Sequence, residues 1–336
     1  MLYSKDKLEA LRHRWTTPNG KKMLKLIKST RCYLSPVLFR QKVTHFPGIN
    51  DKEVEDAVDL RGIPLPGFDF RSSVKEDDDY QEEIAILSNI HFEGANLKHC
   101  NFQGGKIHDC KFEHVDLSHT EFKNSTINNC DFSEAQCMGM NLHGSKIIDC
   151  DFKDAIIKDI SLDRVLIDQH TTFGHKIRSE KEKNYHYAAV EYKQIKEMYK
   201  SSSLHSLADK YYHKEMVMKR KTMSMLHPHY WLNFIFGDLL CKYGTSFVRV
   251  IMAAILVVVG CASAYTVNNS LIYHNSVVDA SFADALYYST VTFTTLGYGD
   301  FHPIGEMRYL AAVESFVGAA LLSLFTVIVA RQLIRD

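Results

Sequence analysis

The sequence predicts a multidomain chain: a column of short β-repeats, then a helical connector, then an all-α membrane region. Three observations lead to this prediction. Apolar residues recur at every fifth position between residues 85 and 167. Apolar residues then follow helical spacing from Lys181 to Met223. Finally, residues 246–267 and 309–329 are apolar over the length that crosses a bilayer as a helix.

The composition is that of an ordered protein with balanced charge. Hydrophobic residues make up 46% of the 336 residues, and 40 basic residues face 40 acidic ones. This balance gives no sign of a nucleic-acid partner. We find no nucleophile and base pairing, phosphate loop or metal-ligand spacing, so we expect neither an enzyme nor a cofactor.

The N-terminal region, residues 1–59, is predicted to form a helical cap. Its start alternates charged and apolar residues and lacks the pattern of a secretory signal, so we expect a cytosolic location. In that compartment the eight cysteines should remain thiols. A helix around Trp15 to Lys28 is expected to cover the open edge of the repeat column.

The repeats have a period that fits neither a helix nor a strand. From Leu87 to Ile167 every fifth residue is Leu, Ile or Phe, apart from Cys137, and most residues two positions earlier are small. The chain must therefore turn regularly and bury two residues in each unit. The segments DCKF at Asp109, NCDF at Asn129 and DCDF at Asp149 add a longer period of about twenty.

These repeats resemble the pentapeptide-repeat family. The resemblance implies a right-handed quadrilateral β-solenoid over residues 60–170, with an insertion at 71–84 after a first coil. Cys110, Cys130 and Cys150 should then stack on one interior face, where a small apolar residue is favoured over a metal site. His99 and His119 should lie on adjacent coils, as a proton or metal site or as solvated surface residues.

Three further regions follow the repeats. Residues 171–226 are predicted to form a cytosolic α-helical hairpin with a break near Ser201 to Ser203. Residues 227–245 are rich in Trp, Tyr and Phe and are predicted to form an interfacial amphipathic helix. Residues 246–336 contain the two apolar stretches, which we interpret as membrane spans rather than as buried core helices.

Charge predicts how the spans are oriented. No Lys or Arg occurs from Val250 to Met307, whereas basic residues flank the outer ends of the pair: Lys242, Arg249, Arg331 and Arg335. Positive residues favour the cytosolic side, so we expect a multi-pass protein with both termini in the cytosol. The segment after the second span is short, and we therefore expect any regulation to come from the N-terminal half.

Between the spans, residues 280–300 are too apolar for an ordinary loop. We expect a helix that begins near Asp279 or Ser281 and ends near Thr294, followed by the stretch TTLGYGD. Irregular backbone at membrane depth is tolerated only where it is buried in protein or lines a water-filled path. The stretch should therefore line such a path.

This region resembles the pore of two-transmembrane-helix potassium channels. The resemblance implies a selectivity filter made of Thr295, Leu296, Gly297, Tyr298 and Gly299. Backbone carbonyls of the first four would coordinate potassium, the permeant ligand, and the two glycines would permit the required dihedral angles. Leu296 replaces the commoner Val, a change that leaves its carbonyl in place.

The resemblance also implies residues that support the filter. Asp300 matches an acidic residue at the outer mouth, where the Tyr287 hydroxyl is expected to hold it. Some family members carry a Glu where this chain has Val291, so behaviour that depends on that Glu is not expected.

The second span holds two further candidates. Glu314, a carboxylate within the membrane, is either a functional group or a hydrogen-bond partner of hydroxyls such as Thr290 or Thr292 behind the filter. Gly318 lies near midspan and is either a bending point for a gate or a close helix contact.

One chain supplies one filter loop, so the expected unit is a homotetramer. The sequence thus predicts a potassium-selective channel in a lipid bilayer, in a prokaryotic cytoplasmic membrane by analogy with the family. Its solenoid should regulate gating or bind an unidentified cytosolic protein or ligand. A nonselective cation channel and a membrane-tethered pentapeptide-repeat binding module remain as alternatives. Mimicry of DNA is disfavoured because the repeats mix Lys and His with Asp and Glu.

Overall fold

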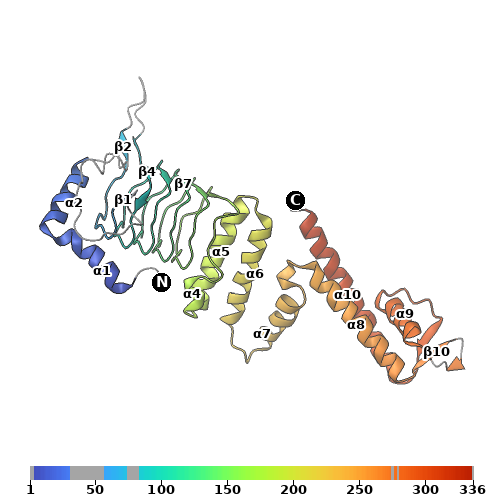
Figure 1. Cartoon of the computed structure of the whole chain (residues 1–336). Helices are drawn as coiled ribbons and strands as arrows, with labels where there is room; N and C mark the ends of the chain where they lie inside the picture. The colour runs from blue at the N-terminus through green and yellow to red at the C-terminus, as the bar shows by residue number, and fades with distance from the viewer. Residues whose placement is uncertain (1–3, 31–56, 74–82, 274–275, 278–279, 335–336) are drawn as a thin grey trace. The chain divides into compact units, whose positions relative to one another are not determined.

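A computed structural model of the chain describes residues 4–30, 57–73, 83–273, 276–277 and 280–334 (Figure 1). The chain divides into two compact units, Met1–Thr222 and Met223–Asp336, and each is described by itself. Most of the expected acidic insertion, and the alternative helix start at Asp279, lie outside the described residues.

The first unit contains the predicted β-solenoid (Figure 1). One face is a parallel sheet in which residues 20 apart pair, such as Ile107 with Ile127 and Ile127 with Ile147. Its strands are β4 (Ile86–Ser88), β6 (Lys106–His108), β7 (Thr126–Asn128), β8 (Lys146–Ile148) and β9 (Leu166–Ile167). Isolated parallel bridges, most of them also between residues 20 apart, build the other faces. The β-solenoid implied by the resemblance to pentapeptide repeats is therefore confirmed.

A further coil precedes the insertion, as predicted. Strand β1 (Val58–Asp59) pairs in parallel with β5 (Ile90–His91), and bridges join Pro64 to Asn96 and Asp69 to Asn101. Strands β2 (Ser72–Ser73) and β3 (Glu83–Ile84) pair in antiparallel fashion on either side of the insertion. The repeat pattern thus continues across an interruption of the chain.

Rows of apolar side chains from successive coils fill the interior of the column. Rings along one row stack with centroids 4.7 to 5.3 Å apart, and they belong to Phe92, Phe112, Phe132, Phe152 and Phe173. Such offset stacking adds to the free energy gained from burial.

The cysteines and the histidine pair lie where the repeats predict. Cys110, Cys130 and Cys150 are buried, and the last two donate to carbonyl oxygens of their own coils at 3.3 and 3.2 Å. Among the described residues, no group of three His, Cys, Asp or Glu side chains is placed to hold a metal ion. The exposed rings of His99 and His119 stack with centroids 5.2 Å apart.

The N-terminal edge of the solenoid is closed by helices α1 (Lys5–His13) and α2 (Pro18–Thr30). The predicted helix from Trp15 was wrong at its start, because Trp15 lies in a 3-10 turn, η1 (Arg14–Thr16), and Pro18 begins the next helix. The Trp15 Nε1 donates to the Arg61 carbonyl oxygen at 2.7 Å. The cap therefore provides partners for backbone groups that the first coil leaves unpaired.

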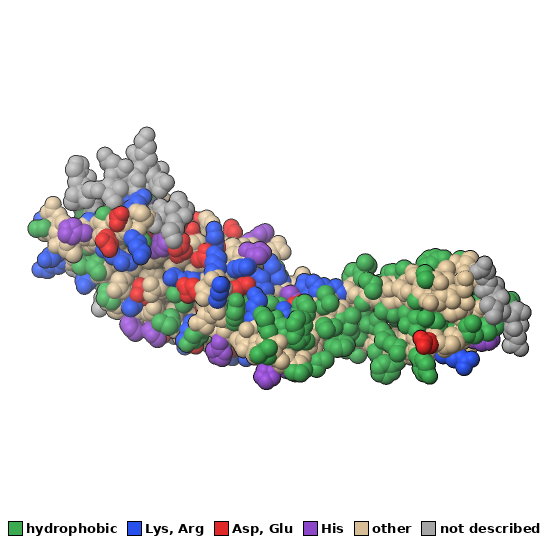
Figure 2. All heavy atoms as spheres, turned by 90° about the horizontal axis from the view of Figure 1, so that it is seen from below, with side chains coloured by type: hydrophobic (Ala, Val, Ile, Leu, Met, Phe, Trp, Pro, Cys, Tyr) green, Lys and Arg blue, Asp and Glu red, His purple; other side chains and the backbone are tan. Residues whose placement is uncertain are grey.

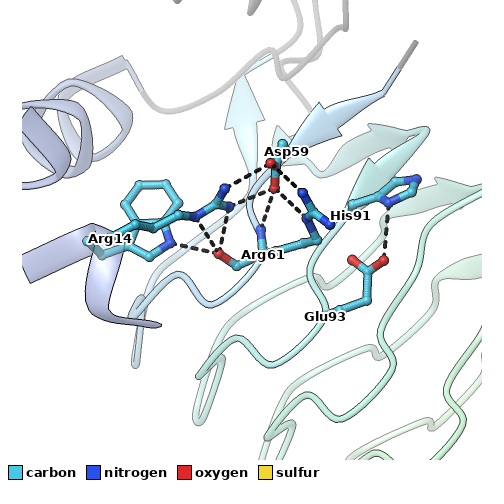
Figure 3. A network of polar contacts seen from close by, with 6 residues as sticks. Arg14, Asp59, Arg61, His91 and Glu93 are labelled. Carbon is cyan, nitrogen blue, oxygen red and sulfur yellow. Dashed lines mark hydrogen bonds and ion pairs between the residues drawn. The ribbon is translucent and has the colours of Figure 1, made fainter. Parts of the chain in front are cut away.

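An ion-pair network joins this cap to the first coil of the solenoid (Figure 3). Arg14 Nη2 and Arg61 Nε lie 2.6 and 3.0 Å from Asp59 Oδ1, and Arg61 is fully buried. Burial acts to raise the pKa of Asp59, but the hydrogen bonds and charges of both guanidinium groups outweigh it and hold that pKa well below its usual range. The ionised carboxylate therefore stabilises the capped edge.

The C-terminal edge is closed by a helical hairpin. Helix α4 (Arg178–Lys181) precedes α5 (Tyr185–Ser201) and α6 (His205–Lys221), and the predicted break near Ser201 to Ser203 is confirmed. The Ser201 hydroxyl donates to the Val165 carbonyl oxygen at 2.8 Å, and the Tyr199 hydroxyl donates to that of Thr171 at 2.7 Å. Solenoid and hairpin share one hydrophobic core.

The second unit contains two long apolar helices, α8 (Phe247–Val267) and α10 (Met307–Leu333). Only 11% and 22% of their most apolar stretches are buried within the chain, whereas the core helices of a soluble protein are mostly buried. Hydrophobic side chains, green in Figure 2, cover much of the visible face of this unit. Exposed apolar surface of this extent is typical of helices surrounded by lipid.

The expected single interfacial helix over 227–245 is interrupted. The structure shows α7 (Pro228–Leu232), a π-helical segment η3 (Asn233–Leu239) and a turn η4 (Lys242–Gly244). Apolar side chains along α7 and η3 are exposed, including Trp231, Phe236 and Leu239. The segment keeps the apolar surface expected of a membrane interface, but its backbone is irregular.

The Asp59 network gives a first testable prediction. Replacing the carboxylate in Asp59→Asn leaves the buried Arg61 without its countercharge, so we expect the first coil to lose about 3 kcal/mol of local stability at pH 7. Hydrogen exchange of the amides of residues 58–70 in the full-length protein measures this change. Because the pKa of Asp59 is depressed in the folded state, its contribution is complete above about pH 5 and is lost at lower pH.

Asp69→Asn is the matched control. Asp69 pairs with Arg71 at 2.7 Å in the same sequence arrangement, but both side chains are more exposed than those of the buried pair. Pairs of this kind contribute about 0 to 1 kcal/mol, so little change is expected. Equal effects of the two substitutions would contradict the role given to the cap network.

Candidate functional site

A short helix between the two spans leads into the TTLGYGD stretch. Helix α9 (Phe282–Phe293) begins with a capping box in which the Ser281 hydroxyl accepts from the Asp284 amide and the Asp284 carboxylate accepts from the Ser281 amide. The predicted start at Ser281 is confirmed, and the helix ends one residue before the expected Thr294. The helix is thus fixed at its start by its own sequence.

The loop after α9 has an unusual backbone. The Thr295 amide donates to the Thr292 carbonyl oxygen and the Leu296 amide donates to that of Val291, both at 3.0 Å, which is a Schellman ending of the helix. Thr295, Gly297 and Gly299 have φ angles of 59°, 55° and 78°. Glycine adopts this left-handed region without penalty, whereas a β-branched residue such as Thr295 is strained there.

The residues after this helix ending are open to their surroundings. The side chains of Leu296 and Tyr298 are 62% and 68% exposed. In the part of the chain that the structure describes, the backbone amides of residues 297–299 donate no hydrogen bond to another backbone group. Inside a membrane, such backbone is stable only if protein groups, water or ions bind its N–H and C=O groups.

The loop is anchored at its far end by Asp300. The Tyr287 hydroxyl donates to Asp300 Oδ2 at 2.9 Å, so the contact predicted between these residues is confirmed. Asp300 Oδ1 also accepts from the amide of Phe301 at 2.9 Å. Helix α9 therefore holds both ends of the loop.

A small sheet that the sequence did not predict continues from this anchor. Strand β12 (Phe301–Pro303) pairs in antiparallel fashion with β10 (Leu271–Tyr273), which also pairs with β11 (Ser276–Val277). The run LIY at 271–273 has the composition of a strand, but three residues are too few to identify one from sequence.

Behind α9 lies a buried carboxylate. Glu314 of α10 is 1% exposed and accepts hydrogen bonds from the Tyr265 hydroxyl of α8, at 2.8 Å, and from the Ser289 hydroxyl of α9. The partners expected from the sequence were wrong, because Thr290 donates instead to the Leu286 carbonyl oxygen and Thr292 makes no hydrogen bond to Glu314 that the structure records. Ser289, one position earlier, occupies the face of α9 that meets the other helices.

Gly318 lies where α10 comes closest to the end of α9. A Cβ atom on Gly318 would lie 2.0 Å from the carbonyl oxygen of Phe293, the last residue of α9. Helix α10 runs without a break from Met307 to Leu333. This geometry favours the close-contact interpretation of Gly318 over the bending point.

Comparison with known proteins gives a consistent assignment for two parts of the chain. Residues 246–335 match a family described as an ion channel, and residues 85–175 match a family described as a pentapeptide repeat region. The chain therefore contains an ion-channel segment and a pentapeptide-repeat region. No curated protein matches the chain as a relative.

Solved pentapeptide repeat proteins are among the similar structures. One, Rfr23 from the cyanobacterium Cyanothece 51142, is 16% identical, with 40% of this chain and 96% of that chain covered and a TM-score of 0.27. Another, from the thylakoid lumen of Arabidopsis thaliana, is 19% identical, with 35% and 70% covered and a TM-score of 0.24.

The contact at Gly318 gives a second testable prediction. Gly318→Ala places a methyl group against the Phe293 carbonyl oxygen, so we expect a loss of about 1 to 3 kcal/mol in the stability of the purified protein in detergent. Gly260→Ala in α8 is the matched control, because nothing lies within 4 Å of a Cβ atom there. Thermal unfolding compares the two, and an equal response would contradict the close contact.

Proposed function

We propose that the chain forms a homotetrameric potassium-selective channel whose filter is Thr295 to Gly299. The observation that carries this proposal is the backbone after α9. Three residues there adopt left-handed φ angles. The amides of residues 297–299 donate to no other described backbone group, and they follow a helix that packs against two apolar helices. Such groups favour a cation because carbonyl oxygens can replace its hydration shell.

The direction of α9 supports a cation rather than an anion. The C-terminal end of a helix carries a partial negative charge, and α9 ends at Phe293, directly before the filter. Potassium would be the permeant ligand, coordinated by the backbone carbonyls of Thr295, Leu296, Gly297 and Tyr298. No cofactor has a role in this proposal.

Exposure of the loop supports assembly. One chain leaves Leu296 and Tyr298 largely uncovered, and a closed ring of carbonyls needs several copies around an axis. Four copies would place four loops around one path, with Asp300 and Tyr287 at its outer mouth. Ser289, Tyr265 and Glu314 would hold each α9 from behind.

Charge and exposure support the placement in a membrane. The stretch from Val250 to Met307 lacks Lys and Arg, so both termini and the solenoid would face the cytosol of a prokaryotic cell. Helices cover both edges of the solenoid, which leaves its side faces to bind a cytosolic protein or ligand. Through such binding the solenoid would regulate the pore.

The filter gives a third testable prediction. Gly297→Ala places a Cβ atom on a residue with φ of 55°, where a side chain costs about 1 to 3 kcal/mol of backbone strain. Relief of that strain turns the carbonyl groups away from the path. We expect potassium flux into vesicles to fall at least about tenfold. Gly260→Ala should leave flux unchanged, since Gly260 has open space around it.

Native mass spectrometry of the same samples tests the assembly. A tetramer is expected for the unsubstituted protein and for both variants. Equal sodium and potassium flux would favour the nonselective channel instead. A protein that shows no flux and no tetramer would favour a membrane-tethered binding module.

A further inference from the structure

The chain enters the membrane through an unusual turn, residues 241–247, which we call the entry joint. Lys242, Tyr243 and Gly244 have φ angles of 51°, 55° and 78°, so three consecutive residues are left-handed. Two of them carry side chains that disfavour this region. Contacts from the surrounding structure must therefore hold the turn in place.

Those contacts come first from the segment just before the turn. The ring of Tyr243 is buried against Gly237 of η3, where a Cβ atom would lie 2.6 Å from Tyr243 Cε1. The Arg249 guanidinium donates to the Asp238 carbonyl oxygen at 2.6 Å, which ties η3 to the start of α8. A larger residue at position 237 would displace the ring.

The entry joint also contacts the cytosolic end of α10. Gln332 Nε2 donates to the Thr245 carbonyl oxygen at 3.4 Å, and a Cβ atom on Gly244 would lie 3.2 Å from Arg331 Nη1. One turn earlier, Cys241 and Ile328 belong to the same buried cluster. The rings of Phe247 and Phe325 meet edge to face with centroids 6.4 Å apart. Contacts thus extend along the last two turns of α10.

We propose that the entry joint clamps the cytosolic end of α10 and sets the equilibrium of an inner-helix gate. This inference rests on the proposed channel function. In the sequence, residues 223–240, which include η3, lead from α6 to this joint. Displacement of α6 or η3 therefore changes the left-handed turn, and the turn carries the change to Ile328, Arg331 and Gln332. The two states differ in whether α10 keeps these contacts.

Two substitutions of Lys242 distinguish the effect of the left-handed backbone from the effect of the Lys242 charge. Both Lys242→Gly and Lys242→Val remove the ammonium group, but glycine accepts a φ of 51° and valine opposes it. In the full-length tetramer we expect Lys242→Val to shift the open probability at least about fivefold, the lower range of typical allosteric coupling. Lys242→Gly should stay close to the unsubstituted protein.

Hydrogen exchange of residues 325–332 gives a readout that does not require conduction. Lys242→Val should speed exchange there, and Lys242→Gly should not. Gln332→Ala removes one contact from the α10 side and should also speed exchange, which keeps the test valid if Lys242→Val fails to assemble. Unchanged exchange in both Lys242→Val and Gln332→Ala would overturn the clamp.

The remaining outcomes are equally decisive. Faster exchange with unchanged open probability would overturn the link to the gate, and equal effects of Lys242→Gly and Lys242→Val would assign the result to charge. If the unsubstituted protein does not conduct, the channel proposal fails, whereas the exchange data still test the clamp.

Discussion

Backbone hydrogen bonding is the constraint on which both units of this chain depend. Among the described residues, most peptide groups of a solenoid coil pair with a neighbouring coil, so the first and last coils need partners from elsewhere in the chain. Trp15 and Arg14 cover the first edge and Ser201 and Tyr199 cover the last. Helices α8, α9 and α10 satisfy most of their own backbone, whereas the described amides of residues 297–299 donate to no other backbone group. That contrast is why this stretch is the candidate site.

A buried carboxylate is one of the groups that position the helix before the open stretch. Glu314 joins all three helices of the membrane unit through the hydroxyls of Tyr265 and Ser289, and Ser289 Oγ also lies 2.9 Å from the Val258 carbonyl oxygen. Removing a buried polar group's partner costs more than the contact itself gains, so the three helices are strongly coupled. The close approach of Gly318 to Phe293 fixes the same helix end from the other side.

Much of this architecture could be predicted from the sequence because it follows from local periodicity. The five-residue period predicted a chain that turns regularly, the apolar stretches predicted both long helices, and of the two predicted starts of α9, Asp279 or Ser281, the structure has Ser281 as the N-cap. The contact of Tyr287 with Asp300 was also foreseen, because the resemblance in this region is strong. These features depend on spacing along the chain, which the sequence records directly.

Other features depend on tertiary packing and could not be predicted. The rotation of α9 decides that Ser289 rather than Thr290 meets Glu314, and no local pattern encodes that rotation. Tyr265 looks like one more apolar residue of a span. The left-handed turn at Lys242 and Tyr243 has no sequence signal at those two residues, since neither favours positive φ, and it is held by Gly237 and α10 instead.

The most direct test of the account is the reversal potential of the purified full-length protein in a planar bilayer, with potassium on one side and sodium on the other. The account predicts a reversal potential close to the potassium equilibrium value, because the carbonyl ring would replace the hydration shell of potassium. A reversal potential near zero would contradict potassium selectivity and assign the loop to a nonselective pore.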